Sequence, residues 1–290
     1  MKDKTRTLFE LLRIRQWIKN LLIYIALIFT NNLFNFGLLI KTTIGFIFLC
    51  FAASSIYILN DIKDANEDKH HPIKKHRPIT SGKVGLSFAL SVSVFLMLIS
   101  LFGSFVLQKS FFIIILIYIL LSFSYTLKLK NIVILDILIV ASNYVLRAIS
   151  GAIIINVAIS PWLLICTSLL ALFVILAKRR YELSLTSATK HRKILEEYSI
   201  PLLDEMISVT TASTISAYAL YTFTSETATK HNYLLLTIPF VLYGIFRYLY
   251  LIHKKNLGGS PEYIFLKDVP TIINIIFWII SIIIIVYFIK

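Results

Sequence analysis

The chain has 290 residues, of which 58% are hydrophobic and only 15% are charged, and its mean hydropathy is +0.81. Because soluble globular domains contain roughly a quarter charged residues, this composition excludes a soluble protein and predicts a polytopic membrane protein surrounded by lipid. The net charge of +14 does not indicate a nucleic-acid partner, since the basic residues lie between apolar stretches and not in one patch with interleaved aromatic residues.

Apolar stretches of close to 20 residues, the length that crosses a bilayer, recur along the chain. They predict nine transmembrane helices, at about 18–38, 43–60, 86–107, 111–127, 132–155, 161–178, 206–225, 233–252 and 270–289. We therefore expect one all-α integral-membrane domain over residues 1–290. Its loops at about 61–85, 128–131, 178–205 and 253–269 would share one side of the membrane. No small-residue cleavage site follows the first apolar stretch, so we expect the N-terminus to be retained.

The basic residues are divided unequally between the two sides of this arrangement. Lys41, Lys109, Lys230 and Lys290 lie on one side and Arg147 and Arg247 lie within spans, whereas all other Lys and Arg residues lie with the N-terminus and the long loops. The positive-inside rule then places the N-terminus and these loops in the cytoplasm and the C-terminus outside.

The N-terminal stretch RIRQWIKN (residues 13–20) joins basic residues, a tryptophan and an amide at the edge of the first expected span. One interpretation is interfacial anchoring, in which Arg and Lys reach the lipid headgroups and Trp17 belongs to the aromatic belt. The alternative is that Lys19 and Asn20 enter the bundle and bind a lipid phosphate or a phosphate of a soluble substrate.

The most informative polar stretch follows the second expected span and reads NDIKDANED over residues 60–68. On a helix, Asn60, Asp61, Asp64 and Asp68 fall within an arc of about 100°, so their oxygen atoms converge on one face. Such oxygens suit Mg²⁺, which usually shares its coordination shell with substrate phosphates. The spacing therefore predicts a cation site formed by these four residues.

A simpler interpretation of this stretch is a solvated loop that is charged because it lies beside a membrane. The spacing favours the metal site, because unneutralised carboxylates are costly at the mouth of an apolar helix and are by default functional.

A second group of polar residues surrounds the fifth expected span. It consists of Tyr125, Lys128 and Lys130 in a tight turn, followed by Asp136, Asn143 and Arg147 on the span. Spacings of seven and four residues place the last three on one stripe, within roughly 40° of one another. Charges within a span face the bundle interior and mark a ligand pathway, although a structural ion pair between helices is an alternative. Asp136 and Arg147 lie about 16 Å apart along the axis and cannot pair with each other.

The sixth expected span ends with Lys178, Arg179, Arg180 and Glu182. Consecutive bases also anchor a helix to anionic lipid, so charge alone does not make this a binding site. The last loop, GGSPEYIFLKDVP over residues 258–270, is rich in turn residues and breaks the chain before the ninth span.

These stretches resemble the UbiA-type intramembrane prenyltransferase superfamily. The acidic stretch NDIKDANEDKHHPIKKHRPITSG marks the superfamily, whereas RQWIKN, LKNIVILDIL and GGSPEYIFLKD are similar to its decaprenyl-phosphate phosphoribosyltransferase branch. Together the matching stretches extend from one end of the chain to the other. The resemblance implies nine helices around a central cavity that opens to the cytoplasm, in a protein of a bacterial-type inner membrane.

The activity that this resemblance implies is Mg²⁺-dependent transfer of a phosphoribosyl group from 5-phosphoribosyl 1-diphosphate to a polyprenyl phosphate, with release of diphosphate. The product would be a lipid-linked pentose donor for a cell-envelope glycan. By the same resemblance, Asn60, Asp61, Asp64 and Asp68 would hold Mg²⁺ on the leaving diphosphate, with the three aspartates as catalytic residues. Expected substrate contacts are Lys19, Asn20, Arg77, Tyr125, Lys128, Lys130, Asp136, Arg147, Lys178, Arg179, Arg180 and Glu182. A homo-oligomer is compatible with this assignment.

The chain departs from the wider superfamily after the sixth span. Members that use prenyl diphosphates carry a second acidic motif of the D-x-x-x-D kind there, whereas this chain reads KRRYEL. Bases in place of a second metal site suit a donor with an additional phosphate. The alternatives are transfer of a prenyl group from a prenyl diphosphate to an aromatic acceptor, and a non-enzymatic transporter. The matching broken helices that mark many transporters do not occur in the two halves.

Overall fold

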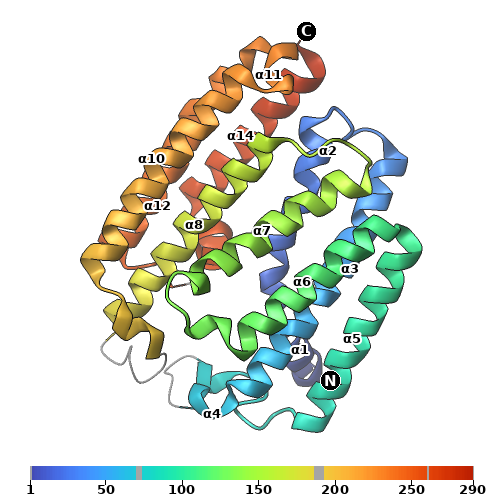
Figure 1. Cartoon of the computed structure of the whole chain (residues 1–290), viewed down its shortest axis with the longest axis vertical. Helices are drawn as coiled ribbons and strands as arrows, with labels where there is room; N and C mark the ends of the chain where they lie inside the picture. Colours follow the sequence, from blue (N-terminus) through green and yellow to red (C-terminus); the bar gives the residue numbers. More distant parts are fainter. Residues whose placement is uncertain (1, 70–73, 186–192, 260, 290) are drawn as a thin grey trace.

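The computed structural model describes residues 2–69, 74–185, 193–259 and 261–289, and residues 70–73 and 186–192 of two expected loops lie outside this description. The regular elements of the described residues are all helices. The expected all-α class is therefore confirmed. The two termini lie at opposite ends of the bundle, as do α4 (Ala65–Asp68) and α11 (Glu226–Lys230) (Figure 1). We call the end that carries α4 the motif end.

Among the described helices, seven are long and apolar enough to cross a membrane. They are α3 (Phe36–Lys63), α5 (Leu86–Leu107), α6 (Lys109–Leu127), α7 (Leu135–Ile154), α8 (Pro161–Ser184), α14 (Val269–Phe288) and the segment Asn232–Lys255, which joins η5 (Asn232–Thr237) to α12 (Ile238–Lys255). The expectation of nine spans is not confirmed, because the stretches expected at 18–38 and 206–225 do not meet this criterion.

The first expected span is interrupted. It is divided into η1 (Ile14–Tyr24), the short α2 (Ile25–Phe29) and a turn before α3. Asn31 is left-handed in this turn, with a φ of 59°, and the Asn35 side chain accepts a hydrogen bond from Leu38 N–H at the start of α3. Asparagine favours both positions, so it ends one helix and begins the next within an apolar stretch.

The seventh expected span falls on α10 (Ile200–Thr224), which has 25 residues and is therefore about 37 Å long. This helix packs along α8, and its many Thr, Ser and Ala residues keep its hydropathy below that of the seven candidate spans. The Thr214 hydroxyl donates to the Thr210 carbonyl at 2.6 Å, and Thr210 bonds back to Met206 O at 2.8 Å. These hydroxyls are thus satisfied by their own helix without water.

The remaining short elements connect the long helices. They are α1 (Lys2–Leu11), η2 (Lys74–His76), η3 (Leu129–Asn131), η4 (Lys193–Glu197) and α13 (Pro261–Lys267). Pro270 lies in the first turn of α14, and Asp268 caps that helix by accepting from Thr271 N–H. The expected break before the last span is therefore present, because proline at this position lacks only an N–H that would have no partner in the helix.

The central helix of the bundle is α7 (Figure 1). One hydrophobic core joins it to η1, α2, α3 and α6, and another joins it to α8, α10, α12 and α13. The backbone of η1 approaches α7 closely at Gly151, where a Cβ atom would lie 1.9 Å from the Ile23 carbonyl oxygen. Only glycine permits this approach. It brings Asn20 and Arg147, one turn earlier on each helix, into hydrogen-bonding distance.

Candidate active site

A cavity of about 1850 Å³ is lined by residues of η1, α3, α4, α6, α7, α8 and α13. Its basic lining residues are Arg13, Arg15, Lys19, Lys63, Lys74, Arg77, Lys130, Arg147, Lys178, Arg179 and Lys267, and its acidic ones are Asp64, Glu67, Asp68, Glu182, Glu196, Glu197 and Glu262. Because bases outnumber acids inside a low-dielectric bundle, the cavity attracts anions. It is also large enough for a substrate of drug size or above.

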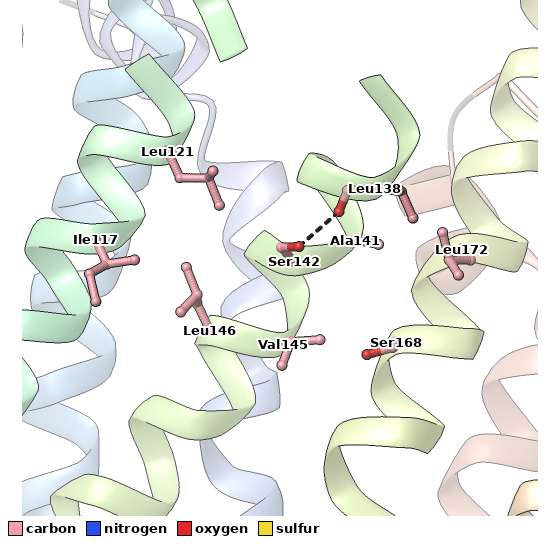
Figure 2. A pocket seen from close by; sticks show the side chains of 9 residues that line it. All are labelled: Ile117, Leu121, Leu138, Ala141, Ser142, Val145, Leu146, Ser168 and Leu172. Carbon is pink, nitrogen blue, oxygen red and sulfur yellow. Dashed lines mark hydrogen bonds between the residues drawn. The ribbon is translucent and has the colours of Figure 1, made fainter. Parts of the chain in front are cut away.

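A smaller pocket of about 420 Å³ lies on another face of α7, between α6 and α8 (Figure 2). Figure 2 shows Leu121 of α6 and Leu146 of α7 at one side of it and Leu172 of α8 at the other. Its polar side chains are Ser142 and Ser168, and the Ser142 hydroxyl already donates to the Leu138 carbonyl at 2.9 Å. None of the described residues that line this pocket is charged, so it suits apolar chains and not phosphates.

Three residues of the acidic motif face the large cavity together. The Asp64 N–H donates to Asn60 O and the Asp68 N–H donates to Asp64 O, each at 2.9 Å, so the helical path continues from α3 into α4. Residues four apart then share one face, and all three side chains line the cavity. The expected convergence is present for Asn60, Asp64 and Asp68.

The fourth residue of the motif is placed differently. Asp61 is 3% exposed and is absent from the cavity lining. Its carboxylate pairs with the guanidinium of Arg13, through both oxygens, and accepts from Arg77 at 2.9 Å. Asp61 follows Asn60 and is therefore rotated about 100° away from it. The expected role of Asp61 as a metal ligand is not supported by this geometry, in which it fixes two arginines at the cavity wall.

The two aspartates of the motif that face the cavity are each paired with a base. Lys130 lies 2.6 Å from Asp64, and Arg77 lies 2.5 Å from Asp68. The pKa of Arg77 is lower than its ordinary value, because burial and the nearby Arg13 guanidinium lower it by more than Asp61 and Asp68 raise it. A phosphate that displaced these acids could bind the two cationic side chains, Arg77 and Lys130.

The residues present fit a divalent cation that is shared with a ligand. The Asn60 Oδ1 atom is buried and has no hydrogen-bond partner among the described residues, and it lies on the same helical face as Asp64 and Asp68. Yet no three His, Cys, Asp or Glu side chains in the described part of the chain gather closely enough to hold a metal alone. Mg²⁺ commonly takes one or two carboxylates and completes its shell with phosphate oxygens and water.

Arg147 forms a buried cationic centre that also lines the cavity. Its guanidinium donates to Asn20 Oδ1 at 2.7 Å, to Asn143 O at 2.7 Å and to the Tyr118 hydroxyl at 3.0 Å. It also lies over the rings of Tyr118 and Tyr144, 5.0 and 5.3 Å from their centroids. All of these partners are neutral, so a buried positive charge remains available to an anion.

Asp136 lies behind the cavity wall and not in it. It is fully buried and accepts from Arg179 Nε at 2.9 Å and from the Tyr198 hydroxyl at 2.7 Å. The Tyr198 hydroxyl accepts from the Ile134 N–H at 2.7 Å, which supports a strained φ of 67° at Ile134. Burial raises the pKa of Tyr198 to about 12. Asp136 therefore forms an ion pair between α7 and α8, as in the structural alternative.

The other expected substrate contacts separate into two sets. Those that line the cavity are Lys19, Arg77, Tyr125, Lys130, Arg147, Lys178, Arg179 and Glu182. Asn20 is buried against Arg147, Arg180 pairs with Asp204 of α10 at 2.5 Å, and Lys128 is exposed beyond α6. These three do not reach the cavity, and we assign them no direct substrate contact.

One lining residue, Glu262, has no counterpart in the sequence-based set. Its carboxylate lies 2.5 Å from the Lys19 ammonium. Burial would raise the pKa of Glu262, but Lys19 and Lys178 lower it to about 2. The two glycines before it are the available signal in the sequence: a Cβ at Gly259 would lie 2.2 Å from the Tyr181 ring, so the loop can pack on α8 only without one.

Comparisons with known proteins agree with this architecture. The UbiA prenyltransferase family pattern matches residues 21–267. The chain is 33% identical to the decaprenyl-phosphate phosphoribosyltransferase of Mycolicibacterium smegmatis, over 96% of this chain and 92% of that protein. It is 30% identical to the protein of the same name from Corynebacterium glutamicum, over 99% of this chain and 88% of that protein.

Solved structures show the same fold. A UbiA homologue from Archaeoglobus fulgidus bound to GPP and Mg²⁺ superimposes with a TM-score of 0.74 at 18% identity, over 96% of this chain and 99% of that one. The structure of the same homologue bound to DMAPP and Mg²⁺ superimposes with a TM-score of 0.70. From the family match, the relatives and the fold together, the chain is an enzyme that belongs to the UbiA prenyltransferase family.

Proposed function

We propose that the chain transfers the 5-phosphoribosyl group of 5-phosphoribosyl 1-diphosphate to a polyprenyl phosphate and releases diphosphate. The observation that carries this proposal is the division of the cavity: Asn60, Asp64 and Asp68 line it where α3 continues into α4, and Lys178 and Arg179 line it from α8. A donor with phosphates at both ends matches these two walls. The names of the relatives support the same donor and acceptor.

Asn60, Asp64 and Asp68 are the residues that would hold Mg²⁺. The ion would neutralise negative charge that develops on the departing diphosphate. Arg77 and Lys130 already lie beside these acids and would contact diphosphate oxygens once the acids turn toward the cation. Charge-assisted hydrogen bonds of this kind orient the leaving group and strengthen as the bond breaks.

Arg147 would attract the acceptor phosphate. It lies about 18 Å along α7 from Leu135, within the apolar part of the bundle, where a lipid substrate brings its own anion. An oxygen of that phosphate forms a bond to C1 of the ribose, while the bond from C1 to the diphosphate oxygen breaks and its electron pair leaves with diphosphate. The acceptor is already ionised near neutral pH, so the transfer does not require a general base.

We place the motif end in the cytoplasm and the C-terminus outside, because the basic loops lie with the N-terminus. The cavity then meets a soluble phosphorylated donor from the cytoplasm and a lipid acceptor from the membrane.

The experiment uses the purified full-length chain in lipid nanodiscs, donor labelled in the ribose, a polyprenyl phosphate and Mg²⁺. We expect one equivalent of label in the lipid fraction for each diphosphate released, and loss of both products with EDTA or in Asp64→Asn. Glu226→Gln on the exposed α11 is the matched control and should keep full activity. Diphosphate release without label in the lipid would contradict the proposal.

A further inference from the structure

Glu262 is an unexpected residue in a cavity that attracts anions. It is 9% exposed, lines the cavity and is ionised, because Lys19 pairs with it at 2.5 Å. A buried carboxylate repels the ionised oxygens of a phosphate group. It binds a ligand favourably only where that ligand offers hydroxyl or N–H donors. Glu262 therefore indicates a substrate that carries hydroxyl groups as well as phosphates.

Lys178 provides the complementary charge. Its ammonium group lines the cavity and has no hydrogen-bond partner among the described residues, although Glu262 and Glu182 are its electrostatic neighbours. The wall around Glu262 thus combines a carboxylate acceptor with an ammonium donor, Lys178, that has no hydrogen-bond partner among the described residues.

This wall is built separately from the acidic motif. Lys19 belongs to η1, Lys178 to α8 and Glu262 to α13. The loop before α13 is held on α8 by Gly258, whose added Cβ would lie 2.9 Å from the Ala177 carbonyl oxygen, directly before Lys178. The close packing of this loop fixes Glu262 beside the end of α8. The donor can consequently be held at two points at once.

We propose that Lys19, Lys178 and Glu262 bind the ribose 5-phosphate end of the donor, and this rests on the proposed function. Glu262 accepts hydrogen bonds from the ribose hydroxyls, Lys178 binds the 5-phosphate, and Lys19 orients the Glu262 carboxylate. A prenyl diphosphate has no hydroxyl groups and would offer Glu262 no hydrogen-bond donor in addition to Lys19. The subsite therefore selects sugar phosphates over prenyl diphosphates.

The test measures binding of ribose 5-phosphate to the full-length protein in nanodiscs without Mg²⁺, with inorganic phosphate as the second probe. We expect Glu262→Gln to weaken ribose 5-phosphate at least tenfold and not to weaken phosphate. Lys178→Met should weaken both probes. Glu226→Gln is the control for neutralising an acid elsewhere.

Unchanged ribose 5-phosphate affinity in Glu262→Gln, or an equal loss for both probes, would overturn the subsite. Thermal unfolding checks that each variant is folded. Glu262→Asp keeps the charge and replaces Glu262→Gln if that variant is unstable, with a weaker loss for ribose 5-phosphate expected. If the wild-type protein binds ribose 5-phosphate but transfers no label, the proposed function is wrong and the subsite stands. If the Glu262→Gln variant transfers label with an unchanged donor KM, the subsite is wrong and the proposed function stands.

Discussion

Asp61 and Asp64 belong to the same motif, yet the structure predicts opposite consequences of replacing them. In Asp61→Asn the isosteric amide removes the negative charge between Arg13 and Arg77. Losing one partner of a buried pair costs about 3–5 kcal/mol, because a charge is left uncompensated. The side chains of Arg13 and Arg77 are 20% and 26% exposed, and Arg77 keeps Asp68. We therefore expect a cost below this range, about 2–3 kcal/mol.

The assay is thermal unfolding in nanodiscs, where this cost corresponds to a Tm lower by roughly 4–10 °C. The matched variant is Asp64→Asn. Its pair with Lys130 is nearer the surface, with the Asp64 side chain 23% exposed, so we expect at most about 1 kcal/mol together with loss of Mg²⁺-dependent transfer. The reasoning would be refuted if the Asp61→Asn variant unfolded at the wild-type Tm and lost Mg²⁺-dependent transfer as the Asp64→Asn variant does.

Three further changes test other parts of the account. Arg147→Gln should raise the KM for polyprenyl phosphate about ten- to a hundredfold in transfer kinetics, with a smaller change in the donor KM. This factor is equivalent to the loss of a charged hydrogen bond of about 1.5–3 kcal/mol. Arg147→Lys keeps the charge and should recover part of the affinity for polyprenyl phosphate. Gly151→Ala should cost about 1–3 kcal/mol in thermal unfolding, since its Cβ must displace η1 and with it Asn20; an unchanged Tm would contradict the packing. The folded-state pKa of Glu262 is about 2 against an ordinary value of 4.5, so its pair with Lys19 contributes fully above pH 4.5 and is lost as pH falls toward 2. Glu262→Gln should therefore lower the Tm equally at pH 7 and pH 5 and less at pH 3, and a Tm difference that already disappears at pH 5 would contradict this.

Spacing along the sequence predicted the part of the site that one helix determines. Asn60, Asp64 and Asp68 follow one another by four residues, and the continuous helical path from α3 to α4 places them on one face. The turn before α3 was missed because hydropathy counts residues such as Asn31 and Asn35 only as polar interruptions. Their backbone preferences end one helix and start the next.

The partners of the charged residues could not be predicted in this way. Asp61 pairs with Arg13 from another segment, and Asp136 pairs with Arg179 across two helices. Helical periodicity gives the direction of each side chain relative to its own axis. The partner that occupies that direction depends on how helices pack, and on contacts such as Gly151 against Ile23.

The most direct test of the central claim offers the purified protein two donors and two acceptors together: 5-phosphoribosyl 1-diphosphate, a prenyl diphosphate, a polyprenyl phosphate and an aromatic acid, with Mg²⁺. The masses of the products identify the bond that forms. We predict that polyprenyl phosphate gains one phosphoribosyl group and that the aromatic acid is unchanged. A prenylated aromatic product with unmodified polyprenyl phosphate would contradict the account.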